Sequence, residues 1–403
     1  MTKNPGLSPH ARRPLPSRPV AGPASVCAVL LTASACAAAG TDDTDTIADS
    51  ASEPPSEPRT LSVIGGGDVL VHESVWTQAE ADGGGTYDFA PMFDDVSGRL
   101  HGADLALCHL EVPLGPEEGP FSGYPVFSAP PHLAQGLADA GYDGCSTASN
   151  HTFDQGEDGV VRTLDAMEEA GLGAAGSART EEEAAEPTVH QVDAGAGDAV
   201  PVAHLSYTYG FNGFEAPEGK EWMADLIDEE AILDEAARAR EAGAEIVVLS
   251  LHWGTEYSHE VDADQRELVD LADSSDIDMV LGHHAHVVQP MDLVEDTWVA
   301  YGLGNQIAGQ SSPPIDSRRE GVMAQVEFTE TEPGTWEAGG LQAVPTWVEV
   351  EPDYRVVDLA SAVEDDGERS ADELSVLEQA YARIGGHLDG EGVSGQEGFQ
   401  LVE

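Results

Sequence analysis

Histidine, carboxylate and amide side chains stand at six points along the sequence, each just after a short apolar run. Imidazole, carboxylate and amide oxygen together suit divalent ions such as Zn, Mn or Fe. No thiolate belongs to the pattern, which argues against a structural zinc site. The six points are Asp68 with His72, His109 with Glu111, residues 149–151 with Asp154, His252, residues 283–286, and Asn305.

The apolar runs before these residues predict strands that alternate with helices, which is typical of an α/β fold. Gly65, Gly66 and Gly67 are expected to turn the chain after the first strand. The later part, from Val322, alternates as antiparallel strands do. Predicted strands cover residues 61–64, 104–108, 143–147, 201–206, 245–251, 278–281, 298–301 and 322–328, and predicted helices cover residues 91–100, 131–140, 156–170, 228–242 and 262–272.

The six points converge if the strands are parallel neighbours, because ligands of open α/β sheets bind at the carboxyl ends of the strands. Each residue alone has a plainer interpretation: Asp68 as a helix cap, Asn150 as a turn residue, Glu111 as one more solvated acid. Two ions held about 3.5–4 Å apart would lower the pKa of a bound water. A nearby imidazole would protonate the leaving group.

The charge balance of the 403-residue chain is extreme, with 75 acidic and 17 basic residues and a net charge of -58. Nucleic-acid binding is disfavoured because it needs basic patches on the protein surface. We interpret the acidity as a solvated surface suited to high salt. The alternative is a surface that gathers cations or repels polyanions.

The N-terminus resembles an export signal over residues 1–36, with Arg12, Arg13 and Arg18 before an Ala-rich apolar run that is too short for a membrane span. Two interpretations stay open. Cys36 is the lipidated first residue of a lipoprotein, or residues 33–35 form an A-x-A cleavage site. Residues 37–60, rich in acids, Ser and Pro, predict a disordered tether.

Cys108 and Cys145 each end an apolar run and are predicted to be buried thiols, not a disulfide. Residues 181–186 and 193–198 are predicted to form a surface loop. A folded domain is expected over residues 61–310, with residues 311–360 as completing strands and residues 361–403 as a helix (residues 370–384) and a mobile acidic tail.

The residues at the strand ends resemble a known family. The chain is similar to the bacterial capsule-synthesis CapA, or poly-gamma-glutamate synthesis, family, which is related to calcineurin-like metallophosphoesterases. The matching stretches keep the family order. They are residues 67–68 with His72, 110–113 (LEVP), 127–130 (FSAP), 148–151 (ASNH) with Asp154 and Gly156, 251–257 (LHWGTEY), 282–286 (GHHAH) and 301–305 (YGLGN).

This resemblance implies a layered α/β sandwich with helices flanking two central sheets. It also implies two divalent ions (Mn, Zn or Fe) and a role for each residue. By this analogy one ion is held by Asp68, His72 and His286, and the other by Asn150, His252 and His284. Glu111 would bridge the ions, while His151 would act as the acid, oriented by Asp154.

The sequence departs from the family pattern at several places. Asp68 and His72 are four residues apart, where phosphoesterases use Asp-x-His. Glu111 stands for the usual bridging Asp, and His109 stands where Asn is usual. The choice between His283 and His284 stays open, with His284 favoured because it forms His-x-His with His286.

The resemblance implies an exported protein of capsule polymer synthesis, export or trimming that hydrolyses a phosphoester or an amide. The expected substrate is an anionic polymer or a phosphoester, and the expected partners are membrane polymer-synthesis proteins. Contact with the membrane is expected only through a lipid anchor. The alternatives are a non-catalytic accessory or scaffold subunit and a secreted phosphatase or nucleotidase.

Overall fold

The computed structural model describes residues 58–402 except 196, 274, 311–315 and 365–368. The predicted signal and most of the predicted tether lie outside these residues. The chain divides into two units, Met1–Pro55 and Ser56–Glu403, and the described residues all belong to the second. None of the helices within them is both long enough and apolar enough to cross a bilayer.

The described strands form two sheets, where the sequence alone suggested neighbours in one layer. The first sheet has parallel neighbours β1 to β4 on one side and antiparallel strands on the other. Its order is β14 (Arg355–Asp358), β13 (Thr335–Glu349), β12 (Glu320–Glu332), β1 (Thr60–Leu70), β2 (Leu105–Leu110), β3 (Gly144–Ser146) and β4 (Gly173–Ala175), with β11 (Asn305–Ala308) beside β1 and β15 (Phe399–Leu401) beside β13.

The second sheet has a parallel centre and an antiparallel strand at each edge. Its order is β5 (Thr188–Val192), β6 (Val200–Thr208), β7 (Ile246–His252), β8 (Met279–His283), β10 (Thr297–Ala300) and β9 (Met291–Val294). The apolar runs at 201–206, 245–251, 278–281 and 298–301 therefore belong to a different sheet from those at 61–64, 104–108 and 143–147.

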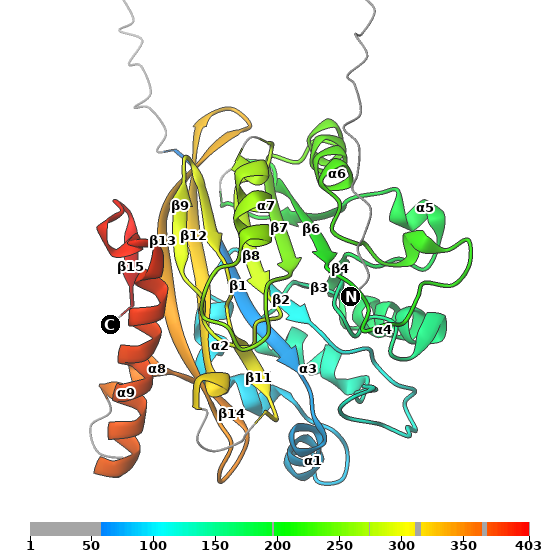
Figure 1. The fold of residues 1–403 in the computed structure, drawn as a ribbon, viewed down its shortest axis with the longest axis vertical. Coiled ribbons are helices and arrows are strands. Elements are labelled where there is room, and N and C mark those ends of the chain that lie inside the picture. Colours follow the sequence, from blue (N-terminus) through cyan, green and yellow to red (C-terminus); the bar gives the residue numbers. More distant parts are fainter. Residues whose placement is uncertain (1–57, 196, 274, 311–315, 365–368, 403) are drawn as a thin grey trace, which may run out of the picture. The chain divides into compact units, whose positions relative to one another are not determined.

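The two sheets pack face to face, and helices cover their outer faces (Figure 1). Leu61 and Val63 of the first sheet share the central core with Leu281 and Trp298 of the second. This confirms the predicted α/β sandwich. The first sheet carries α1 (Glu73–Asp82), η1 (Ala90–Phe93), α2 (Asp94–Leu100) and α3 (His132–Ala140), which packs on α4 (Gly156–Ala170). The second carries α6 (Glu229–Glu241) and α7 (Ala263–Asp273). Next to β13 lie α8 (Leu359–Val363) and α9 (Ala371–Leu388).

The expected turn at Gly65, Gly66 and Gly67 is wrong, because β1 runs through these glycines with a bulge before Asp68. A Cβ on Gly67 would lie 2.3 Å from the carbonyl oxygen of Gly304, and one on Gly65 would lie 2.5 Å from Leu281 Cδ1. The glycines thus permit close approach of the neighbouring strand and sheet, which is a known use of glycine inside strands.

Local capping residues explain where several helices begin and end. Asp228 accepts a hydrogen bond from the backbone of Ala231 at the start of α6, and Ser370 forms a capping box with Glu373 at the start of α9. The predicted helix over residues 370–384 is confirmed and extends to Leu388. The loop over residues 181–186 is wrong in part, since α5 (Glu181–Ala184) is helical.

The predicted mobile tail is also wrong. After α9 the chain forms two short 3-10 helices, and β15 then pairs in parallel with β13. The last described residues therefore complete the first sheet, and Val402 N donates to the carbonyl of Ala343.

Cys108 and Cys145 form a disulfide, so the prediction of two separate thiols is wrong. They lie directly opposite each other on β2 and β3, with their Cα atoms 4.4 Å apart. That separation suits a disulfide. Their spacing in the sequence carries no information on strand register, which is why the pairing was missed.

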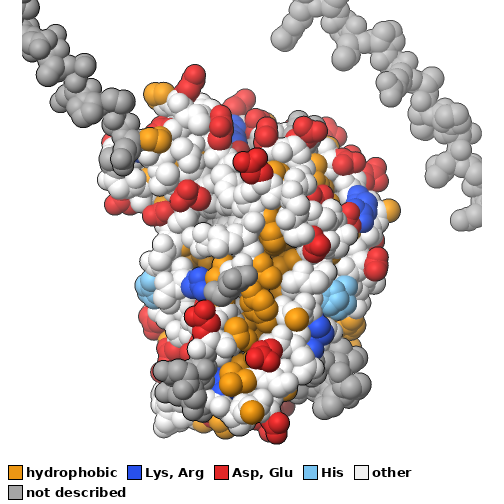
Figure 2. Space-filling model, turned by 90° about the vertical axis from the view of Figure 1, so that its left-hand side faces the viewer, with side chains coloured by type: hydrophobic (Ala, Val, Ile, Leu, Met, Phe, Trp, Pro, Cys, Tyr) orange, Lys and Arg blue, Asp and Glu red, His pale blue; other side chains and the backbone are white. Residues whose placement is uncertain are grey.

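Acidic residues greatly outnumber basic residues in the chain, and one face of the described structure reflects this excess. Figure 2 shows one face on which Asp and Glu side chains are spread widely, with few Lys and Arg between them and a run of hydrophobic side chains along the middle. The abundant acids thus remain in contact with water, where charge is least costly.

Replacing both cysteines, as Cys108→Ser with Cys145→Ser, is expected to lower the free energy of unfolding by about 3–4 kcal/mol. The disulfide closes a loop with a sequence separation of 37 and so restricts the unfolded chain. Denaturant unfolding of the wild type and the double variant measures the difference. Reductant should bring the wild type toward the variant. Equal unfolding midpoints in oxidising buffer would show that the bond does not form.

Candidate metal centre

The ends of strands from both sheets meet at one buried site. In the first sheet, Asp68 lies opposite His109 across β1 and β2. In the second, His252 and His283 are the last residues of β7 and β8 and lie opposite each other. All four are at most 2% exposed. The parallel register of each sheet therefore places imidazoles and a carboxylate at the same edge.

Asp68 links the two sheets at this edge. Its Oδ1 lies 3.2 Å from His283 Nδ1, and its Oδ2 lies 3.0 Å from His286 Nδ1 and accepts from the backbone N–H of His284 at 3.2 Å. Burial alone would raise the pKa of Asp68, but the hydrogen bonds with His283 and His286 lower it below the usual range. The carboxylate is therefore ionised.

Glu111 follows β2 and lies opposite His286, with 3.6 Å between Oε1 and Nε2. Burial raises the pKa of Glu111 to about 7. Burial also acts to lower the pKa of His286, but Glu111 and Asp68 outweigh it and raise that pKa to about 9. Asp68, Glu111 and His286 bring one ligand atom each within 4.8 Å of one another.

His109, His252 and His283 form a second group of rings. His109 Nε2 lies 2.9 Å from His252 Nδ1, and the His109 ring stacks on His283 with centroids 4.2 Å apart. Ser146 Oγ lies 2.7 Å from the other nitrogen of His109. Burial and neighbouring imidazoles lower the pKa of His109 and of His252. These two rings are therefore neutral and offer nitrogen lone pairs.

His284 lies between the groups. Its ring centroid is 4.6 Å from that of His252 and 4.6 Å from that of Tyr209. Asn150 forms a side-chain hydrogen bond with Tyr209. Burial raises the pKa of Tyr209, and this hydrogen bond acts to lower it. Burial, followed by the charge of His286, lowers the pKa of His284 to about 3. The His252 and His284 rings thus lie side by side, and Asn150 is linked to them through Tyr209.

Several buried atoms at this site have no hydrogen-bond partner among the described residues. They are both carboxylate oxygens of Glu111, Oδ1 of Asn150, Nε2 of His252 and of His283, and Nδ1 of His284. Buried polar atoms normally find a partner, since leaving one unpaired costs roughly 1–3 kcal/mol. Carboxylate oxygens and neutral imidazole nitrogens are the donors that divalent transition metals accept. The site therefore fits the divalent ions predicted from the sequence.

The backbone of the loop after β8 is held in an unusual conformation. His284 has φ +84° and His286 has φ +55°, in the left-handed region that residues other than glycine rarely adopt. Side chains at 283, 284 and 286 consequently all face the site instead of alternating away from it. Strained backbone of this kind tends to occur at functional sites.

His151 and Asp154 form a pair beside the cluster. His151 Nδ1 lies 2.7 Å from Asp154 Oδ2, which also accepts from the backbone N–H of Phe127 at 2.6 Å. The Phe127 ring meets the His151 ring edge-on at 4.7 Å. Asp154 and Phe127 thus fix the orientation of the imidazole, and Nε2 remains available for proton transfer.

His72 is separate from the ligand groups found among the described residues. Its Nδ1 lies 3.0 Å from the carbonyl oxygen of Leu70 and 3.2 Å from the backbone nitrogen of Gly309. Burial, followed by the charge of His286, lowers the pKa of His72. His72 therefore lies within electrostatic reach of the cluster, with Nδ1 already engaged by the backbone.

Sequence reasoning missed Glu256 and Tyr209. Glu256 brings a carboxylate oxygen within 4.8 Å of ligand atoms of His284 and His286, although it is exposed. Its signal was present in the LHWGTEY stretch, where it follows His252 by four residues. Tyr209 follows β6, a strand without any chemical group predicted at its end.

Asp68, His109 and His283 also form a ligand group, which brings in two histidines left outside the predicted set.

Comparison with known proteins gives a family match over residues 62–310, to the bacterial capsule synthesis protein model PGA_cap. The PGA biosynthesis protein CapA of Bacillus subtilis (strain 168) is 29% identical over 175 residues, which are 43% of this chain and 44% of that protein. The capsule biosynthesis protein CapA of Bacillus anthracis is 28% identical over 187 residues, 45% of this chain and 44% of that protein. The aligned segments thus span less than half of each relative.

Two solved structures show a looser likeness. A phosphatase from Mycoplasma pneumoniae is 11% identical with a TM-score of 0.43, over 72% of this chain and 94% of its own. The calcineurin-like phosphoesterase YfkN from Bacillus subtilis is 13% identical with a TM-score of 0.42, over 81% of this chain and 98% of its own.

The family match rests on sequence and covers more than half of the 403 residues. The chain belongs to the bacterial capsule synthesis protein family PGA_cap.

Proposed function

We propose that this chain is an exported metal-dependent hydrolase that acts on a capsule polymer or on a phosphoester in its synthesis. The observation that carries the proposal is the set of buried carboxylate and imidazole atoms, unpartnered among the described residues, where the two sheets meet. A structural cluster would pair these atoms with one another. A site built to hold cations leaves them free.

Asp68, Glu111 and His286 would hold one ion, with His72 as the remaining ligand of that set. Asn150, His252 and His284 would hold the second, and Glu111 would lie between the ions. The proximity of Asp68, Glu111 and His286 supports the first set, and the closeness of the His252 and His284 rings supports the second. His283 competes with His284, because it also groups with Asp68 and His109.

Divalent ions, when bound, activate water and neutralise charge on the group under attack. The chain's own residues do the rest. His151 delivers a proton to the leaving group through Nε2, while Asp154 accepts from Nδ1 and keeps the ring in place. Glu111 itself is 1% exposed, so bulk water has little access to its carboxylate.

Export of the chain is part of the same proposal. The basic and apolar leader suggests it, and the Cys108–Cys145 disulfide supports it, because such bonds persist in oxidising compartments. Lipidation of Cys36 would keep the domain at the cell surface, near membrane proteins of polymer synthesis. The mass of the mature N-terminus tests this directly.

Metal content separates a metal centre from a structural cluster. Plasma mass spectrometry of protein prepared with Mn²⁺ or Zn²⁺ is expected to give two ions per chain, and His252→Ala is expected to lose at least one, because it removes a ligand nitrogen. His190→Ala is the matched control, since His190 lies on edge strand β5 outside the ligand groups of the described residues. Equal metal content in wild type and His252→Ala would contradict the proposed ligand set.

Catalysis is tested at the proposed proton donor. His151→Ala and Asp154→Asn are expected to keep the metal and to lower kcat by about 100- to 10,000-fold, the usual range for loss of a general acid. Assays use a phosphodiester and poly-gamma-glutamate as substrates, with Asp158→Asn on the exposed side of α4 as the control. Metal-loaded wild type that turns over neither substrate would favour the accessory role instead.

A further inference from the structure

Among the described residues, Arg318 lacks a carboxylate partner, although acids are in large excess in this protein. Most described cations are paired, as in Arg59 with Glu330 and Arg99 with Asp358. Arg318, by contrast, forms no ion pair with any carboxylate of the described residues. The buried Nε of Arg318 also has no hydrogen-bond partner among the described residues. A half-buried guanidinium without a counter-charge carries a desolvation cost, which a bound anion would offset.

The position of Arg318 is tied to the metal centre through Asn305. Asn305 Nδ2 donates to the backbone oxygen of Arg318 at 2.8 Å, and its Oδ1 lies 3.1 Å from His286 Nδ1. Arg318 belongs to η3 (Asp316–Arg319), directly before β12. One amide side chain therefore joins a proposed ligand to the segment that carries the guanidinium.

Tyr257 holds the guanidinium from the other side. Arg318 Cζ lies 5.1 Å from the centroid of the Tyr257 ring, which in turn lies 6.0 Å from that of His286. Tyr257 has φ +63°, and its backbone N–H donates to the carbonyl of Ala285 at 2.7 Å. The tyrosine ring is thus the spacer between His286 and the guanidinium, and it is 46% exposed at the rim of the site.

The overall charge of the chain bears on how an anionic substrate could reach this rim. An anion that approaches a chain of net charge -58 meets general repulsion. A local cation beside the centre, such as Arg318, is what would draw the anion in.

We propose that Arg318, held over Tyr257, binds an oxyanion of the substrate at the rim of the metal centre. This rests on the proposed function and specifies its substrate class as one with a carboxylate or phosphoryl group next to the bond that is cleaved. The planar guanidinium can bind either group through two parallel hydrogen bonds. Tyr257 keeps the plane of the guanidinium fixed.

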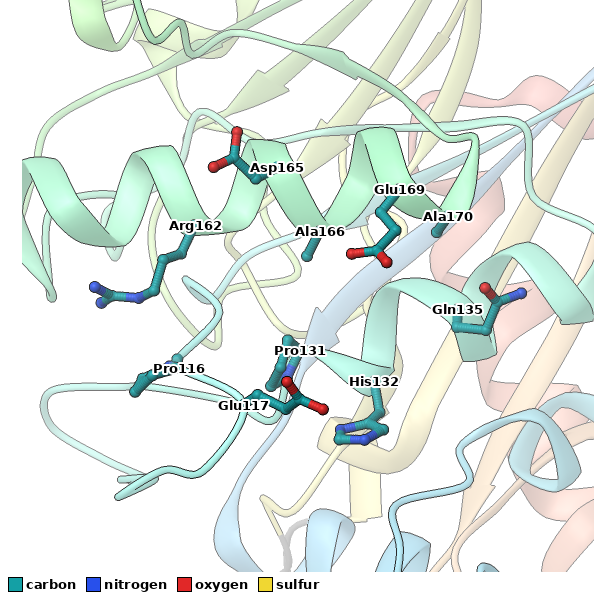
Figure 3. Close-up of a pocket in the computed structure, with 11 residues that line it drawn as sticks. Pro116, Glu117, Pro131, His132, Gln135, Arg162, Asp165, Ala166, Glu169 and Ala170 are labelled. Carbon is teal, nitrogen blue, oxygen red and sulfur yellow. The ribbon is translucent and has the colours of Figure 1, made fainter.

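Arg162 supplies a matched comparison elsewhere in the molecule. Its Nε is also buried without a hydrogen-bond partner among the described residues. The Arg162 side chain extends from α4 over Pro116. Both residues line a cavity of about 400 Å³ between α4 and α3 (Figure 3). Glu117, Asp165 and Glu169 line that cavity, so its charge disfavours an anion. Arg162→Gln therefore removes a similar guanidinium without touching the proposed oxyanion site.

Calorimetric titration with inorganic phosphate and with gamma-linked diglutamate tests the assignment, on metal-loaded and metal-free protein. Arg318→Gln is expected to weaken binding about 10- to 100-fold, as loss of charged hydrogen bonds does. Arg318→Lys should lie between this variant and the wild type, and Arg162→Gln should match the wild type. Loss confined to phosphate identifies a phosphoryl group, and loss confined to diglutamate identifies a carboxylate.

The role of Arg318 is overturned if the wild type binds neither ligand, or if Arg318→Gln binds both as tightly as the wild type does. Metal content is measured on the same samples and is expected to be unchanged in Arg318→Gln. A wild type without metal contradicts the proposed function, while the metal-free titrations still report on Arg318. Unchanged anion affinity with metal present contradicts only the oxyanion site. Circular dichroism verifies that each variant is folded.

Discussion

The arrangement of the site depends on one buried carboxylate. Asp68 is fully buried, and an ionised carboxylate in that position is tolerated only with partners close by. Its partners come from the other sheet: His283, the backbone of His284, and His286. The glycines before Asp68, the bulge in β1 and the left-handed backbone of His284 and His286 all serve to bring these groups within reach of it.

Charge has opposite arrangements inside and outside this protein. Outside, carboxylates stand in water with few cations between them. Inside, at the junction of the sheets, carboxylates and imidazoles are gathered away from the surface, and their mutual effects determine which are charged. Burial raises the pKa of Glu111 to about 7, and Glu111 with Asp68 raises the pKa of His286 to about 9, whereas burial lowers the pKa values of His109, His252 and His284. His252 and His284 are thus neutral nitrogen donors, whereas a bound cation would have to displace the proton that Glu111 and Asp68 favour on His286.

Much of this fold was readable from the sequence, because buried parallel strands leave continuous apolar runs and polar groups directly after them. The runs before Asp68, Glu111, His252 and His283 are of this kind. The periodicity of apolar residues does not show which strands belong to which sheet. The expectation of two sheets came from the family resemblance. The prediction of a turn at the three glycines of β1 is wrong because the local sequence does not show the tertiary contact between Gly67 and Gly304. The Cys108–Cys145 bond was missed for the same reason.

Sequence reasoning singled out several residues that the structure brings together, among them Asp68, Glu111 and His286. Which of His283 and His284 faces the centre cannot be decided from alternation, because positive φ at His284 turns the loop so that both do. Tyr209 and Arg318 carry no local signal at all. They matter through ring contacts with residues that lie far away in sequence.

The separation of Asp68 from its partners has a consequence for folding. The hydrogen-bonded pairs are 215 to 218 residues apart, so no local structure contains both Asp68 and its partners. Closing such loops is slow, and it needs both sheets to be formed and docked. An ion with affinity for this centre therefore selects the finished native state over every partly folded one, and stabilises it in proportion to the logarithm of the free ion concentration. The availability of metal would thus act as a check on whether the chain has completed its folding.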